Sequence, residues 1–182
     1  VVHEIALEEL TDAGLRAKLK YCFTEPERLK PDTTRDALTK DQADVFAKLA
    51  QTLRQRGFEP KMVAHFINRL VFCMFAEDVD LLPNKHFAKA LQHCFYNPAE
   101  FQEVCAQLFA MMKDGGRIGT DKIEWFNGGL FDDDTVLALT GKDIGVVLAA
   151  AQTNWADVDP SIFGTLFERG LDPANRVQLG AH

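Results

Sequence analysis

The chain has 182 residues, of which 47% are hydrophobic and 26% charged, the balance of an ordinary folded protein that can bury a sizeable core. Its net charge of −7 excludes the overall basic excess that a protein uses to neutralise a phosphate backbone. No run approaches the roughly 20 apolar residues of a membrane span, and Glu4, Glu8 and Glu9 argue against a signal peptide. We therefore expect a cytoplasmic protein.

The four cysteines show no metal-ligand spacing. Each falls in an apolar, helix-like setting, without a C-x-x-C pair or a nearby His/Cys set. This predicts small buried side chains in a reducing cytoplasm and no metal site.

Residues 1–38 are predicted to form a linker with a short helix. An extended segment is possible at 1–7, and an amphipathic helix is expected at 13–23. Pro26 and Pro31, followed by Asp32, mark a turn-rich connection, so we place the first domain boundary at residue 38.

Residues 39–115 are predicted to form a helical bundle. Thr39 and Gln42 form a candidate capping box for a first helix that ends at Gly57. A second helix begins at Pro60, and because it is apolar on almost every side it belongs at the centre. A third helix, 85–96, is capped by Asn84. A fourth begins at Pro98 and ends at the glycine pair 115–116, and the short connections favour antiparallel packing.

Residues 116–182 are predicted to contain a strand and turn element followed by further helices. Isoleucines 118 and 123 precede a tight turn at Asn127, Gly128 and Gly129. Helices are expected at 142–152 and 160–169, the latter capped by Asp159 and ended by Gly170. The fold class is therefore mainly α: an antiparallel helical bundle with a short strand/turn element and further C-terminal helices.

A first candidate for chemistry is a nuclease-like pattern. Asp32 follows a proline, and Glu59 and Lys61 flank Pro60, which satisfies the PD…(D/E)-x-K order of metal-dependent nucleases. Such a site would bring both carboxylates and the lysine to Mg²⁺ at adjacent strand ends. The first half lies in a turn and the second opens a helix, so chance is the favoured explanation.

A second candidate is the aspartate run at 132–134. It lacks the alternation of a calcium loop, which favours a solvated turn in which Asp134 or a neighbour caps the next segment.

The third candidate is the polar set of the central helix. His65, Asn68 and Arg69 share one helix face. Arg69 could clamp a phosphate or carboxylate. The favoured interpretation is structural: a buried arginine paired with Glu77, Asp78 or Glu168.

Three blocks in order resemble one family. They are the helix from Phe66 to Pro83, the Phe126–Phe131 segment FNGGLF, and the stretch from Ile162 to Pro173 together with Gln178–His182. They resemble the single-chain type IIL and type IIG (Mme-like) restriction-modification enzymes, which fuse an endonuclease to an adenine methyltransferase. Similar blocks occur in phage-exclusion (BREX-type) adenine methyltransferases.

The resemblance implies a place between two enzymatic parts. In these families a helical spacer joins a nuclease, which needs Mg²⁺, to a methyltransferase that uses S-adenosylmethionine. The end at Leu179–His182 would be followed by a Tyr-Thr pair of the cofactor motif, so no catalytic position carries over. Only Gly180 and His182 flank that motif. A structural role is expected for Arg69, Glu77, Asp78, Asn127, Gly128, Gly129, Glu168 and Arg169.

The sequence therefore predicts a non-catalytic spacer of a bacterial restriction-modification enzyme. Both chain ends look cut, and the expected partners are the flanking nuclease and methyltransferase domains, with DNA bound by the parent. One alternative is a module of a phage-defence methyltransferase that contacts the DNA backbone through Arg54, Arg56 and Lys61. A less favoured one is a small nuclease built on Asp32, Glu59 and Lys61.

Overall fold

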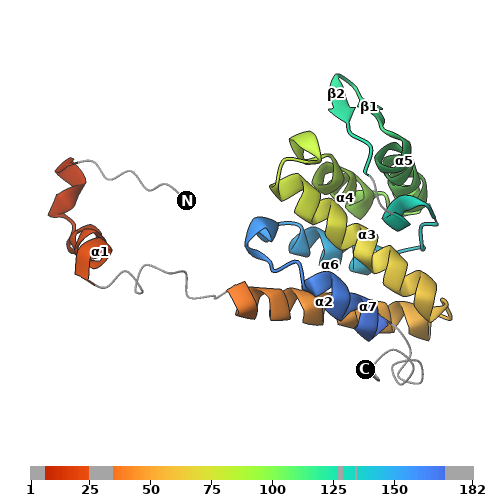
Figure 1. The fold of residues 1–182 in the computed structure, drawn as a ribbon, viewed down its shortest axis with the longest axis horizontal. Coiled ribbons are helices and arrows are strands. Elements are labelled where there is room, and N and C mark those ends of the chain that lie inside the picture. The colour runs from red at the N-terminus through yellow and green to blue at the C-terminus, as the bar shows by residue number, and fades with distance from the viewer. Residues whose placement is uncertain (1–6, 25–34, 127–128, 134, 171–182) are drawn as a thin grey trace.

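A computed structural model describes residues 7–24, 35–126, 129–133 and 135–170 (Figure 1). Near the N-terminus, α1 (Ala13–Thr24) packs with the preceding 3-10 turn Leu7–Thr11. The expectations for residues 1–6, the Pro31 turn and residues 171–182 lie outside the described residues.

The long helix α3 (Pro60–Asp78) lies at the centre of the fold. Twelve of its residues are buried, on all sides of the helix. This agrees with the prediction from its apolar residues, which occur on almost every side. Its neighbours α2 (Arg35–Gln55) and α7 (Ile162–Gly170) pack against it and against each other. Figure 1 shows α7 lying over α2 and α3, although α7 follows α3 by more than 80 residues in the sequence.

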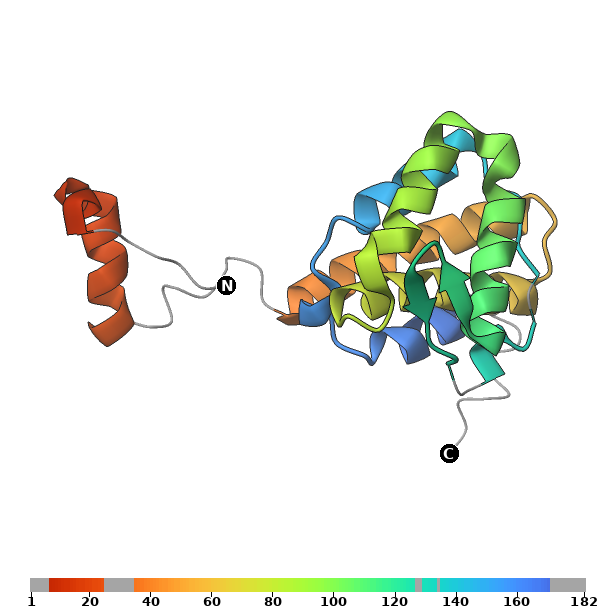
Figure 2. The same cartoon turned by 90° about the horizontal axis from the view of Figure 1, so that it is seen from above.

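The other helices complete the body around α3. They are α4 (His86–Tyr96), α5 (Phe101–Asp114) and α6 (Gly141–Ala150), and α4 packs against α5 and α6. Gly145 of α6 allows this last approach, since a Cβ there would lie 3.1 Å from the Phe95 ring. Figure 2 shows the same body from above.

A small antiparallel hairpin follows α5. Strands β1 (Gly116–Ile118) and β2 (Asp121–Ile123) pair with Arg117 opposite Lys122. Gly115, with φ of 76°, ends α5, as the glycine pair predicted. The prediction of a mainly helical fold with a short strand element is confirmed.

Two predicted helix starts are wrong. Helix α2 begins four residues before Thr39, whose hydroxyl donates to the carbonyl of Arg35 from inside the helix. Asn84 does not cap α4; it lies in the 3-10 turn Pro83–Lys85 with φ of 56°, and the first amides of α4 bind a distant carboxylate instead. A capping residue can be recognised locally, but a cap supplied by another helix cannot.

The start of α6 is fixed by a capping box that also ties it to the turn after α2. Thr140 accepts from the amide of Asp143, and the Asp143 carboxylate accepts from the amide and hydroxyl of Thr140. Arg56 donates to the same carboxylate at 2.6 Å. Burial raises the pKa of Asp143, but these donors outweigh burial and leave the pKa below its ordinary value.

We predict that Asp143→Asn lowers the free energy of unfolding by about 1–2 kcal/mol at pH 7, because the cap and the contact with Arg56 both weaken. A carboxyl group whose pKa is lowered by folding stabilises the fold above its unfolded pKa. The difference between variant and wild type should therefore shrink as the pH falls below about 4. Urea titrations at several pH values measure it, with Asp157→Asn as the exposed control. A pH-independent difference would contradict the assignment.

Candidate functional site: the polar residues of the central helix

Arg69 is buried in the centre of the molecule, with 1% of its surface exposed. Its guanidinium donates to the backbone carbonyls of Asp133 and of Thr135, the latter at 2.9 Å. It also lies 3.8 Å from the Asp133 carboxylate and 5.2 Å from the centre of the Phe109 ring. The prediction that Arg69 is buried and paired is thus met by a different partner: the loop after residue 131, not Glu77, Asp78 or Glu168.

Glu77 caps α4 from the last turn of α3. Its carboxylate accepts from the amide of Phe87 at 2.6 Å and from that of Ala88 at 3.3 Å. These amides belong to the first turn of α4, where a negative group also interacts favourably with the helix dipole. Burial raises the pKa of Glu77, and the two amides only partly oppose this shift.

Asp78 fastens two further segments to the end of α3. One carboxylate oxygen binds the Lys85 ammonium group, and the other accepts from the backbone amide of Trp155 at 2.6 Å. Trp155 is itself buried and donates its indole N–H to the carbonyl of Ala150. Glu77 and Asp78 therefore connect the end of α3 to the start of α4 and, through Trp155, to the segment after α6.

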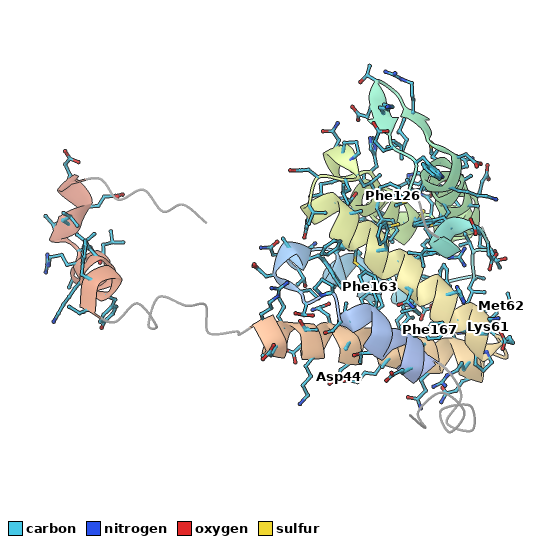
Figure 3. The ribbon with its side chains drawn as sticks, viewed as in Figure 1. Asp44, Lys61, Met62, Phe126, Phe163 and Phe167 are labelled. Carbon is cyan, nitrogen blue, oxygen red and sulfur yellow. The ribbon has the colours of Figure 1, made fainter. Side chains whose placement is uncertain are left out.

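The three sequence blocks that carry the family resemblance meet at one aromatic side chain. Phe72 of α3 makes edge contacts with Phe126 and Phe131, at ring-centre distances of 5.4 and 5.7 Å. The third block reaches it through Phe163 of α7, at 6.3 Å. Figure 3 labels Phe126 and Phe163 close to α3, the latter on α7. Aromatic pairs at such distances stabilise packing beyond their buried area.

The remaining structural candidates are divided between described and undescribed positions. Gly129 opens the 3-10 turn Gly129–Phe131, and Glu168 is exposed on α7. His65 makes an edge contact with Phe167, and Asn68 is buried with no partner for its Oδ1 atom among the described residues.

Some predicted residues lie outside the described part of the chain. They are Asn127, Gly128, Gly180, His182 and the side chain of Arg169. In the aspartate run, where Asp134 or a neighbour was predicted to cap the next segment, the Asp133 carboxylate accepts from the amide of Thr135; Asp134 lies outside the described residues.

The basic candidates lie around the turn between α2 and α3. Lys61 is exposed at the start of α3, and Arg54 lines an open hollow with Gly57 and Glu59. Arg56 is bound to Asp143. The structure therefore brings Arg54 and Lys61 to one turn and directs Arg56 toward α6.

The nuclease pattern meets a competing structural role. The Glu59 carboxylate accepts from the amide of Met62 as the N-cap of α3. Asp32 lies outside the described residues. Within the part of the chain that the structure describes, no group of three or more His, Cys, Asp or Glu residues is placed to hold a metal ion.

Two contacts that hold the fold together were not predicted from the sequence. Thr140 and Asp143 have the spacing of a capping box, so a systematic scan for that motif would have found the start of α6. The carbonyls that bind Arg69 leave no such signal, because a backbone acceptor is present at every position.

The central part of the chain is similar to a domain of known proteins. Residues 61–131 match the model of the MmeI helicase spacer domain. The chain is 27% identical over 155 residues to DNA methyltransferase A of Bacillus subtilis, an alignment that covers 77% of this chain and 17% of that protein. The chain thus spans about a sixth of the relative's length. No solved structure matches.

These matches confirm the resemblance drawn from the sequence blocks. The matched region begins at the first turn of α3 and ends at Phe131, so it contains Arg69, Glu77 and Asp78. Together the two matches support similarity to a restriction-modification-like methyltransferase region. Among the described helices, none has both the length and the apolarity to cross a membrane.

We predict that Arg69→Met lowers the free energy of unfolding by about 3 kcal/mol, because two partly buried hydrogen bonds from a charged donor to backbone carbonyls are lost. Arg69→Lys should recover little, since an ammonium group cannot reproduce the forked geometry of a guanidinium. Denaturation followed by fluorescence measures both. Arg35→Met is the control, since the Arg35 side chain is 56% exposed and lies 3.8 Å from the Asp159 carboxylate, and it should change stability by less than about 0.5 kcal/mol. Equal effects at the two sites would contradict the role given to Arg69.

We predict that the contribution of Glu77 to stability changes with pH in the opposite direction to that of Asp143. A carboxyl group whose pKa is raised by folding favours the folded state while it is protonated, and it loses that contribution as the pH rises from its ordinary value, near 4.5, through the raised one. Wild-type stability should therefore contain a component that falls over this range, and Glu77→Gln should remove it. Glu77→Ala, which leaves the amides of α4 without an acceptor, should cost about 1–2 kcal/mol at every pH. A Gln variant with the wild-type pH profile would refute this.

Proposed function

We propose that the chain is a non-catalytic helical spacer that connects and orients the endonuclease and the DNA adenine methyltransferase parts of a bacterial restriction-modification enzyme. The observation that carries the proposal is the match of residues 61–131 to a spacer domain. In the parent, the methyltransferase would use S-adenosylmethionine and the nuclease Mg²⁺. The flanking domains of the same chain would be the partners of the spacer.

The contacts of α3 support this role. Arg69, Glu77 and Asp78 are bound to backbone groups of the same body, which commits their charges to holding that body together. A spacer that sets the distance between two active sites must resist bending, and a flexible linker of equal length would cover a wide range of distances instead. Charged side chains that bind backbone groups of several other segments are suited to resisting bending.

Similarity to a DNA methyltransferase supports the enzymatic setting. The matched relative has methyltransferase in its name, and the chain corresponds to a small part of it. Accordingly, we place methyl transfer in the parent protein. The phage-defence alternative shares the methyltransferase and lacks the nuclease, and it would need the same stiff helical body.

The proposal is tested by a segment exchange in Bacillus subtilis DNA methyltransferase A. One variant carries residues 35–170 of this chain in place of the matching segment, and another carries a Gly/Ser linker of equal length. We predict that the first retains methylation of DNA and that the linker variant loses at least tenfold, because its domains are no longer held in register.

The Arg69→Met version of the exchanged segment is the matched control. It should fall between the two, because it keeps the sequence but loosens the body. The idea fails if the Gly/Ser variant methylates as well as the parent. A separate assay on the isolated chain, with labelled S-adenosylmethionine and DNA, should give no methyl transfer.

A further inference from the structure

The last two turns of α2 present an exposed face of hydrogen-bond donors. Lys48, Gln51, Thr52 and Gln55 lie at i, i+3, i+4 and i+7, so they share one side of the helix, and all four are exposed. None of the residues from 45 to 58 is acidic. In a chain with a net charge of −7, this end of α2 is a basic and polar exception.

The same end of α2 borders an open hollow at the turn into α3. The hollow has a volume of about 660 Å³, which is within the range of ligand sites, about 300–1,000 Å³. Gln51, Arg54 and Gln55 line it from α2, and Gly57 and Glu59 line it from the turn. The donor face of α2 therefore continues into a concave surface.

Basic side chains surround this hollow. Arg54 is part of its wall, and Lys61 is exposed directly after Pro60, the last residue of its rim. Figure 3 shows Lys61 at the outer end of α3, at the edge of the body. Lys48 lies one turn before Gln51 on the donor face. The structure thus gathers three cations at one end of the α2–α3 pair.

Two neighbouring charged groups are already bound elsewhere. The guanidinium of Arg56 donates to the Asp143 carboxylate at 2.6 Å, which excludes it from the patch. Glu59 carries the one carboxylate among the described lining residues, and that carboxylate accepts from the amide of Met62 at 2.9 Å. The positive charges therefore outnumber the negative ones around the hollow.

We propose that this surface contacts the phosphate backbone of duplex DNA, without reading its sequence. Lysine and arginine charges together with glutamine amides are the groups that bind phosphate and sugar oxygens. The aromatic residue of the lining, Phe58, packs against the core, so it is not presented to a base. A duplex carries about one negative charge per 1.7 Å of its axis, a density that favours it over a single strand. The inference goes beyond the spacer role and does not depend on it.

The test is fluorescence anisotropy of a short labelled DNA duplex titrated with the 182-residue chain at low salt. We expect a dissociation constant of about 10⁻⁵ to 10⁻⁴ M, equal for duplexes of different sequence. A logarithmic plot of the binding constant against salt concentration should have a slope of about −2 to −3, since each phosphate contact contributes about −0.9.

Substitutions separate a local contact from general charge. Lys48→Gln combined with Lys61→Gln should weaken binding about tenfold at low salt and make the slope less negative by about 2. The matched control is Arg117→Gln combined with Lys122→Gln, which removes the same charge from exposed positions of the hairpin and should change affinity less than about twofold. Glu59→Gln should tighten binding, because glutamine keeps an acceptor for the amide of Met62 but has no negative charge. Circular dichroism checks that each variant is folded.

An NMR titration with the same duplex locates the contact. The amide of Gly57 should shift, while that of Gly119, which also lies in an exposed turn with a positive φ, should stay in place. The inference is overturned if the wild-type chain does not bind the duplex, if the two double variants weaken binding equally, or if a single strand of the same length binds as tightly. It is also overturned if inorganic phosphate, at the concentration of the DNA phosphates, displaces the duplex. The spacer proposal is decided separately by the segment exchange.

Discussion

The fold depends on satisfying the charges that α3 carries into the interior. A buried guanidinium or carboxylate is costly unless hydrogen bonds replace the lost water. Arg69 finds them in two carbonyls of the segment after Phe131, and Glu77 finds them in two amides of α4. Because these partners lie in the loop after Phe131 and in the next helix, the charges are satisfied only when those segments pack against α3.

Apolar packing acts at the same place and in the same direction. Phe72 lies within one turn of Arg69 and contacts rings from the segment 126–131 and from α7. Burial of these rings favours any compact arrangement, whereas the hydrogen bonds of Arg69 accept only one. The ring cluster therefore contributes stability and the buried charges contribute the specific arrangement. A stiff spacer needs both, since a loosely packed bundle could hold its parts together without fixing their relative position.

Much of the fold could be predicted from the sequence because the start, the end and the buried face of a helix are determined by residues close together in the sequence. The Pro60 start of α3, its all-round apolar pattern and the Gly115 end of α5 are each determined by a few adjacent residues. The prediction that Arg69 is buried also follows from its apolar helix. Its partner could not be predicted, because two of its acceptors are backbone carbonyls and the nearest carboxylates in the sequence, Glu77 and Asp78, bind other groups.

The charged residues of this chain thus fall into two groups with different physical roles. Those at the end of α3 face inward and are bound within the molecule, so their chemistry is already used. Lys61, Arg117 and Lys122 face solvent, where a charge contributes little to stability and can meet another molecule. A net charge of −7 weakens any broad attraction to nucleic acid. Any contact with nucleic acid must therefore be made by a local group of basic residues and not by the surface as a whole.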